Sequence, residues 1–205
     1  FNGVHKLDGR VGCIQHYSFR DKNSRSNNFV WSIVPDSNLG EYWLSTEKGL
    51  VQFNRLIKET EMYPILLEGR APFSIGSTIE KMGKDSLWVG TGGYGLYQFS
   101  CQNKRFSKYH GMLSDSNHEI TGLLKDSFGN LWIGTMNDGI IKLNSRTAKI
   151  TYYLNKFKHL DKLAKGSIMP IFEGKQKKLW VGTYGAGFYR YDRHSDQFIY
   201  VKILK

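Results

Sequence analysis

Apolar and small residues alternate along this chain in a pattern that recurs with a long period. Four tryptophans lie in nearly the same pentapeptide, 45, 44 and 48 residues apart. The copies are Tyr42-Trp43-Leu44-Ser45-Thr46, Leu87-Trp88-Val89-Gly90-Thr91, Leu131-Trp132-Ile133-Gly134-Thr135 and Leu179-Trp180-Val181-Gly182-Thr183. Each copy is typical of a strand, in which side chains alternate between two faces. In the third copy the large Trp132 and the small Gly134 share one face, which leaves room for a neighbouring sheet.

A second apolar run follows each tryptophan. It begins with a glycine six or seven residues later, and a fifth copy of it opens the chain. The runs are 3–8, 49–54, 95–100, 139–144 and 187–192. Nine residues after the end of each run stands Tyr17, Tyr63, Tyr109, Tyr153 or Val201. These aligned positions indicate one further, outer strand in every unit.

Each unit therefore predicts four short antiparallel strands. Apolar first strands are expected at 30–34, 120–124 and 168–172, and less clearly at 75–79. Turn residues separate the strands, for example Asp126 to Asn130 and Asn137-Asp138-Gly139. A four-stranded unit of about 44 residues is typical of a β-propeller blade, whereas leucine-rich and β-helix repeats are too short. Each tryptophan, with roughly 200 Å² to bury, is expected to anchor a seam between blades.

The predicted fold is an all-β propeller of four complete four-stranded blades, preceded by two strands of another blade. The partial blade is expected at 1–17 and the complete ones at 18–63, 64–109, 110–153 and 154–205, which makes 1–205 a single propeller region. Closing these strands into a ring would leave one blade without its inner strands. We therefore expect an open arc or a piece of a larger propeller.

Composition excludes several classes of protein. The chain is 40% hydrophobic and 23% charged, and its apolar runs are far shorter than the ~20 residues of a membrane-spanning helix. Two cysteines do not make a disulfide scaffold, and Cys13 and Cys101 are expected to be free thiols in separate blades. The six histidines lack metal-ligand spacing, and acidic residues are sparse. We predict no catalytic residues, no metal site and no cofactor.

Binding is the better-supported activity. Loops that lead into the first strands and turns between second and third strands vary, while the strands repeat, and in a propeller both lie on one rim. Aromatic faces beside paired hydrogen-bonding groups suit a sugar ring. The candidate ligand-binding residues are Arg20, Arg25, Asn28, Trp31, Arg70, Tyr94, His118, Asn137, Asp138 and Tyr184. The alternative, that they are merely the variable loop residues of any propeller, stays open.

Net charge adds a second consideration. The formal charge is +11, and lysines are dense between Lys156 and Lys178. Such a patch attracts anionic partners, but no nucleic-acid-binding motif accompanies it. A lysine-rich solvated edge is the simpler explanation of the patch. If the patch is functional, we favour an acidic glycan, uronic or sulfated, over nucleic acid.

The repeat resembles that of the two-component regulator propeller family. Asp126-Ser127-Phe128-Gly129-Asn130-Leu131-Trp132-Ile133-Gly134-Thr135, followed by Asn137-Asp138-Gly139, is its fullest copy, and 26–33 resembles the loop into a first strand. Blade two lacks the aspartate, and blade four has Lys175-Gln176-Lys177-Lys178 in its first hairpin. The resemblance implies an extracytoplasmic sensor, commonly two seven-bladed propellers and a small β-sandwich joined by a membrane helix to a cytoplasmic histidine kinase or hybrid kinase-regulator.

We accordingly predict a periplasmic ligand-sensing propeller, part of an inner-membrane-anchored sensor that regulates glycan-utilisation genes. Its expected partners are an oligosaccharide, the remaining blades and sensor domains of the same chain, and a second copy in a homodimeric receptor. This segment is predicted not to be an enzyme, because kinase activity would lie in domains outside it. Two alternatives remain: a piece of an extracellular polysaccharide lyase or glycosidase, and a structural spacer without a ligand.

Overall fold

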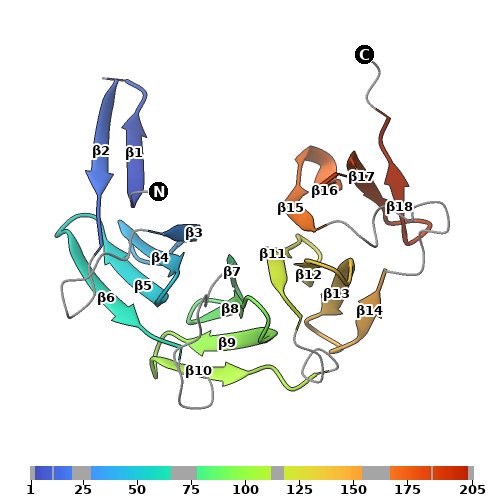
Figure 1. Cartoon of the computed structure of the whole chain (residues 1–205), viewed down its shortest axis with the longest axis horizontal. Helices are drawn as coiled ribbons and strands as arrows, with labels where there is room; N and C mark the ends of the chain where they lie inside the picture. The colour runs from blue at the N-terminus through green and yellow to red at the C-terminus, as the bar shows by residue number, and fades with distance from the viewer. Residues whose placement is uncertain are drawn as a thin grey trace. The chain divides into compact units, whose positions relative to one another are not determined.

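The computed structural model describes residues 3–10, 12–19, 29–65, 78–111, 118–153, 167–185 and 187–202. Within these ranges the chain forms one two-stranded and four four-stranded antiparallel sheets, and its one helical segment is a single 3-10 turn, Lys175–Lys177. In every four-stranded sheet the strands lie side by side in the order of the sequence (Figure 1). The predicted all-β propeller of four blades and a preceding strand pair is confirmed.

The strands fall into five groups. The N-terminal hairpin consists of β1 (Val4–Asp8) and β2 (Cys13–Tyr17). Blade one consists of β3 (Val30–Pro35), β4 (Glu41–Thr46), β5 (Gly49–Asn54) and β6 (Glu59–Tyr63). Blade two consists of β7 (Thr78–Lys81), β8 (Ser86–Gly90), β9 (Leu96–Ser100) and β10 (Arg105–Lys108). Blade three consists of β11 (Ile120–Lys125), β12 (Asn130–Thr135), β13 (Ile140–Asn144) and β14 (Ile150–Tyr152). Blade four consists of β15 (Ile168–Glu173), β16 (Leu179–Thr183), β17 (Gly187–Asp192) and β18 (Gln197–Tyr200).

The first strand of blade two differs from its predicted range. It was expected at 75–79, but β7 begins at Thr78 and extends to Lys81, and residues 75–77 lie outside the described ranges. The other three first strands begin where the apolar pattern begins, and each ends one residue later than expected. The weaker apolar pattern of this segment explains why its position was the hardest to predict.

The chain divides into two compact units, Phe1–Ile79 and Glu80–Lys205. In the first unit the hairpin packs against blade one. Tyr17 of β2 meets Phe53 of β5 edge to face, with ring centroids 5.0 Å apart. Phe19, Leu44 and Val51 complete this buried cluster.

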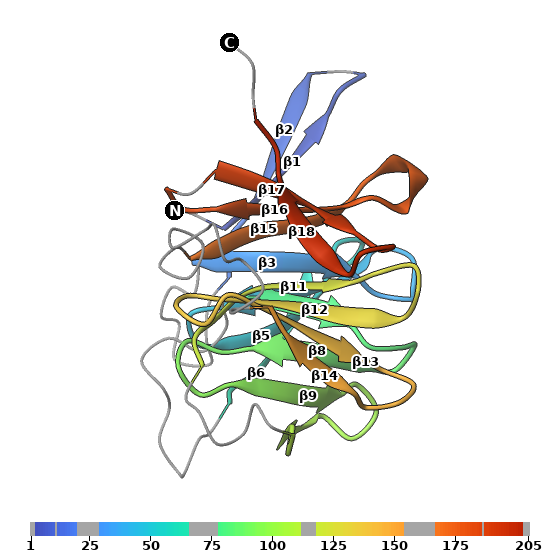
Figure 2. The ribbon, with the colours of Figure 1, turned by 90° about the vertical axis from the view of Figure 1, so that its right-hand side faces the viewer.

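In the second unit blade three packs on blade two, and blade four packs on blade three. Trp88 and Leu96 of blade two share a buried cluster with Ile120 and Leu123 of blade three. Trp132 of blade three shares the next cluster with blade four, including Ile168. Figure 2 shows β15 to β17 of blade four above β11 and β12 of blade three, with β8 and β9 of blade two below them. The tryptophans at these two covered seams are almost completely buried, as the sequence predicted.

The glycine that opens each third strand is required by the backbone. Its φ is positive in all five copies: Gly3, Gly49, Gly95, Gly139 and Gly187. A Cβ on Gly49 would lie 2.4 Å from the carbonyl oxygen of Tyr63, the aligned tyrosine of the outer strand. Only glycine fits so close to another backbone in this conformation. At Gly3 and Gly49 the glycine therefore lets the third strand approach the backbone of the fourth strand closely.

The threonine that ends each pentapeptide closes the turn that follows it. In all four blades its hydroxyl donates to the carbonyl oxygen of that glycine, at 2.6 to 2.9 Å. The four pairs are Thr46 and Gly49, Thr91 and Gly95, Thr135 and Gly139, and Thr183 and Gly187. The turns between second and third strands thus share a fixed base, although the residues at their tips vary.

Asp126 joins the first hairpin of blade three to blade four. Its carboxylate accepts hydrogen bonds from the backbone N–H of Asn130 at 2.9 Å, from Nε1 of Trp132 at 2.8 Å and from Nη1 of Arg193 at 3.1 Å. Burial raises the pKa of Asp126, but these donors outweigh burial and hold the pKa below its usual value. Asp36 binds Nε1 of Trp43 similarly in blade one. The turn-forming role predicted for Asp126 is confirmed, and the bond to tryptophan adds to it.

Candidate functional site

The structure describes six of the ten predicted binding residues. Arg20, Arg25, Asn28 and Arg70 lie outside the described ranges. Trp31 lies on β3 in the first unit, 56% exposed, with its ring centroid 6.5 Å from that of Phe29. The other five, Tyr94, His118, Asn137, Asp138 and Tyr184, belong to the second unit. We therefore describe the candidate site within that unit.

Tyr94 and Asp138 occupy the same position in successive blades. The backbone N–H of Tyr94 donates to Oγ1 of Thr91 at 3.1 Å, and that of Asp138 donates to Oγ1 of Thr135 at 2.8 Å. Each threonine therefore both closes its turn and holds the third residue after it. The side chains at the two turn tips are free to differ, because only backbone groups are needed for this geometry.

The segment that leads into β11 joins these two turns. The carbonyl oxygen of His118 accepts from the N–H of Gly95 at 3.2 Å, and the N–H of Ile120 donates to the carbonyl oxygen of Thr91 at 3.0 Å. On the other side, the carbonyl oxygen of Glu119 accepts from the N–H of Met136 at 2.9 Å. We call these three segments, 91–95, 118–120 and 135–139, the rim of blades two and three.

His118 and Asp138 meet on this rim. Nδ1 of His118 lies 2.5 Å from Oδ2 of Asp138, and their side chains are 10% and 45% exposed. The imidazole is thus almost covered while half of the carboxylate faces solvent. His118 therefore acts as the support and Asp138 as the group available to a ligand. Sequence reasoning selected both residues but missed their pairing, which arises because β11 pairs with β12 inside blade three and so brings positions 20 residues apart together.

Aromatic and amide groups lie in the same turns. Tyr94 is 40% exposed, and Asn137, next to Asp138, is exposed. Tyr184 is 82% exposed at the corresponding turn of blade four, where its N–H donates to the carbonyl oxygen of Ser167 at 2.9 Å. A carboxylate and an amide bind vicinal hydroxyl groups, and an exposed aromatic ring offers an apolar surface to the C–H face of a sugar.

The described parts of the chain contain no group of three or more His, Cys, Asp or Glu side chains arranged to hold a metal ion. No helix in those parts has the length and hydrophobicity that a membrane crossing requires. Neither of the described cysteines, Cys13 and Cys101, forms a disulfide.

One repeat of the chain matches a known family. Residues 114–137, which include β11 and β12, match the family model described as two component regulator propeller. Blade three carries a two-component regulator propeller repeat. The pentapeptides around Trp43, Trp88 and Trp180 repeat its central strand, and the resemblance stated from the sequence is confirmed. None of the curated protein sequences matches the chain.

Solved structures support the same fold. The extracellular domain of the hybrid two component system BT3049 from B. thetaiotaomicron aligns with a TM-score of 0.75 at 20% identity, over 99% of this chain and 26% of that one. The GH74 enzyme of Niastella koreensis aligns at 0.70 and 14%, over 97% and 34% of the two chains. The WD40 β-propeller domain of Doa1 aligns at 0.60 and 7%, over 83% and 53%.

These likenesses establish the β-propeller fold. The chain spans about a quarter of the length of the three extracellular domains from B. thetaiotaomicron that it resembles. The matched family model and the BT3049 structure are both named after two-component systems.

Proposed function

We propose that this chain is part of the extracytoplasmic ligand-sensing propeller of a two-component system, and that the rim of blades two and three binds an oligosaccharide. The observation that carries the proposal is the His118–Asp138 pair. It fixes a half-exposed carboxylate beside the exposed Asn137, on the same rim as Tyr94. The two-component regulator propeller repeat in blade three supports a sensing role.

The chemistry of the rim favours a hydroxylated ligand. Asp138 accepts hydrogen bonds, and the amide of Asn137 both donates and accepts them. Because the backbone of both turns is held by threonine hydroxyls, these groups are positioned before a ligand arrives. Binding would regulate a kinase only if the ligand prefers one arrangement of the sensor over another. In this proposal the sensor is periplasmic and anchored in the inner membrane, and it acts as a homodimer.

A second function, cleavage of a polysaccharide, is favoured by one observation. A GH74 enzyme shares this fold with a TM-score of 0.70. Glycoside hydrolysis needs two carboxyl groups about 5 to 10 Å apart across the scissile bond. Of the carboxylates on the rim, Asp138 is paired with His118. Incubating the protein with polysaccharides and measuring new reducing ends separates an enzyme from a sensor.

A thermal-shift screen tests the binding proposal. The chain is heated with neutral xylo-oligosaccharides, uronic oligogalacturonides and sulfated chondroitin disaccharides. A ligand at 100 times its dissociation constant adds about 2.7 kcal/mol to the free energy of unfolding, which raises the melting temperature clearly. Asp138→Ala and Tyr94→Ala are expected to abolish the shift. The matched control is Arg146→Ala, in the exposed turn between β13 and β14, which is expected to keep it.

The outcomes separate the alternatives. A shift that survives Asp138→Ala and Tyr94→Ala would contradict the assignment of the rim. The absence of any shift with all three classes of oligosaccharide would contradict oligosaccharide recognition by this chain and favour a spacer.

A further inference from the structure

The charged side chains on the rim of blades two and three are mainly acidic. Apart from His118, which is paired with Asp138, the segments 91–95, 118–120 and 135–139 contain the carboxylates of Glu119 and Asp138 and no lysine or arginine. Glu119 is exposed, and the side chain of Asp138 is 45% exposed. The sequence between Gly111 and His118 adds Asp115 and likewise no lysine or arginine. The rim is therefore locally acidic, although the formal charge of the chain is +11.

Glu119 lies between the two turns of the rim. It forms an isolated antiparallel bridge with Gly92, and its carbonyl oxygen accepts from the N–H of Met136 at 2.9 Å. Its neighbours His118 and Ile120 are buried, so the alternation of an extended segment turns the side chain of Glu119 outward. A ligand that contacts the turns of both blades would therefore lie beside two carboxylates.

Many lysines of the second unit lie at the other end of the blades. The turns between first and second strands, and between third and fourth strands, are at the end opposite the rim, because neighbouring strands are antiparallel. The central strands β8, β9, β12 and β13 are five or six residues long, which corresponds to about 17–20 Å. The exposed lysines in these turns are Lys84, Lys104, Lys149, Lys175, Lys177 and Lys178.

Salt separates the two ends electrically. Exposed charges further apart than the Debye length, about 8 Å at physiological ionic strength, are largely screened from each other. The lysines at the far end therefore do not neutralise Glu119 and Asp138. The net charge of the chain is thus a poor guide to the charge that a ligand meets at the rim.

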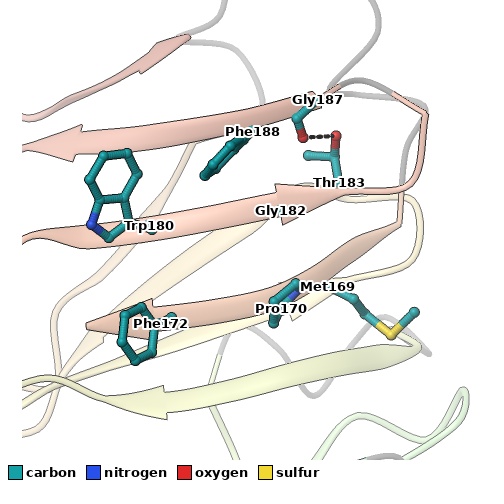
Figure 3. Close-up of a pocket in the computed structure, with 8 residues that line it drawn as sticks. All are labelled: Met169, Pro170, Phe172, Trp180, Gly182, Thr183, Gly187 and Phe188. Atoms are coloured by element: carbon teal, nitrogen blue, oxygen red, sulfur yellow. Dashed lines mark hydrogen bonds between the residues drawn. The ribbon is translucent and has the colours of Figure 1, made fainter. Parts of the chain in front are cut away.

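A hollow on blade four offers a different chemistry. It has a volume of about 610 Å³, and Figure 3 shows its lining residues on β15, β16 and β17, among them Met169, Trp180 and Phe188. We call this surface the open face of blade four. The hydroxyl of Thr183 already donates to the carbonyl oxygen of Gly187. The lining is otherwise mostly apolar, whereas a sugar needs paired hydrogen-bonding groups, so the rim is the better place for an oligosaccharide.

We propose that the rim selects oligosaccharides without acidic groups, so that its ligand carries neither a carboxylate nor a sulfate. This inference rests on the proposed function, because it names the class of oligosaccharide that the same rim binds. The carboxylates of Glu119 and Asp138 accept hydrogen bonds from hydroxyl or amino groups of a sugar and repel uronate and sulfate groups. Acidic groups of a sugar would need lysine or arginine partners, which these rim segments lack.

Thiol labelling measures the sign of the local potential without any glycan. Cys13 and Cys101 are replaced by Ser, and one new cysteine is introduced, either Asn137→Cys on the rim or Ser145→Cys in the turn between β13 and β14 at the opposite end. Each thiol reacts with a cationic and with an anionic methanethiosulfonate reagent. We expect the ratio of the cationic to the anionic rate to be several-fold higher at Asn137→Cys than at Ser145→Cys.

A charge control accompanies the labelling. Adding Glu119→Gln and Asp138→Asn to the Asn137→Cys protein should remove most of the preference for the cationic reagent, because both substitutions keep the size of the side chain and remove its charge. A cationic-to-anionic ratio at Asn137→Cys equal to or below that at Ser145→Cys would overturn the acidic rim, whatever the chain binds.

Thermal shifts test the ligand class itself. Neutral xylo-oligosaccharides are expected to raise the melting temperature, by the same amount at low and at high NaCl concentration, since no ion pair is screened. Oligogalacturonides and sulfated chondroitin disaccharides are expected to give no shift. A shift with either acidic sugar that is lost in Asp138→Ala would overturn the inference and support the proposed function. The absence of a shift with every sugar would contradict the proposed function, and the ligand class with it, even where the labelling finds an acidic rim.

Discussion

Blades three and four contain almost the same central strand, yet the two tryptophans differ in environment. Trp132 is fully buried against Ile168 and Tyr191 and donates to Asp126. Trp180, in the same position of the repeat, is only half-buried and lines an apolar hollow on blade four together with Met169 and Phe188. The repeat therefore specifies the strand, but the adjacent blade determines how much each residue contributes to stability. This is the behaviour expected of repeat proteins, whose stability depends on nearest-neighbour interfaces.

The largest expected effect is the loss of the buried tryptophan. Trp132→Ala should lower the free energy of unfolding by about 3–5 kcal/mol, because a fully buried aromatic side chain leaves a cavity that its surroundings do not refill. Trp180→Ala should cost clearly less, since part of that side chain already faces solvent. Urea denaturation monitored by circular dichroism measures both. Equal losses of stability in Trp132→Ala and Trp180→Ala would contradict the larger contribution that we assign to the buried Trp132.

The next effect concerns the aspartate between blades. Asp126→Ala should destabilise the chain by about 3 kcal/mol, because the buried N–H of Trp132 loses its acceptor and Arg193 loses one carboxylate. Asp85→Ala, at an exposed turn residue of blade two, serves as the control and should change the stability little. Chemical denaturation at neutral pH compares the two variants with the original chain.

This aspartate also makes stability depend on pH. The pKa of Asp126 is lower in the folded than in the unfolded chain. The stability that the ionised Asp126 contributes is therefore fully present above its pKa in the unfolded chain, and it is lost as the pH falls through its pKa in the folded chain. The stability difference between the original chain and Asp126→Asn should therefore shrink toward acid pH. Denaturation curves between pH 7 and pH 3 measure it. A difference that stays constant over this range would contradict the bonded carboxylate.

Lys142 forms a second link between these blades. Its ammonium group donates to the hydroxyl of Tyr191 at 2.9 Å and to Asp196 at 3.0 Å, and it lies 5.3 Å from the ring centroid of Trp132. Lys142→Met should cost about 1–2 kcal/mol, because the apolar stem is kept while the charged hydrogen bonds are lost. Thermal unfolding of Lys142→Met beside Lys149→Met, an exposed lysine, measures it. Equal melting temperatures would show that this link adds nothing.

The turn threonines give the smallest effect. Thr135→Val should cost about 1 kcal/mol, since a buried hydrogen bond to Gly139 is lost at nearly constant side-chain size. Thr183→Val should cost less, because the same bond in blade four is exposed. Differential scanning calorimetry resolves the two. A larger loss for Thr183→Val would reverse the comparison between the blades.

Much of the fold could be predicted because its signals lie within single blades. The alternation around Trp132 predicted the second strand, and the glycine-led run predicted the third strand. The aligned tyrosines indicated the outer strand. The threonine bond was missed, although a Thr stands three or four residues before the Gly in every blade. The end of β7 lies at Lys81, two residues beyond its predicted position, because the apolar pattern of this segment is weak.

The candidate site could be predicted only in part, because its geometry depends on contacts between residues far apart in sequence. His118 and Asp138 were selected as loop residues, but their pairing results from the antiparallel pairing of β11 with β12 inside blade three, which brings the segment before β11 to the turn after β12. The link between Asp126 and Arg193 is likewise formed by residues far apart in sequence. The predicted sites in residues 20–28 and at Arg70 lie outside the described ranges and remain predictions.

The central claim is that the rim of blades two and three, and not the open face of blade four, binds an oligosaccharide. Hydrogen–deuterium exchange of the chain, with and without the oligosaccharide that gives the largest thermal shift, tests it most directly. We expect slower exchange in peptides covering 91–95, 118–120 and 135–139, with no change in 168–172 and 179–183. Protection confined to the peptides of blade four, or no protection anywhere, would contradict the claim.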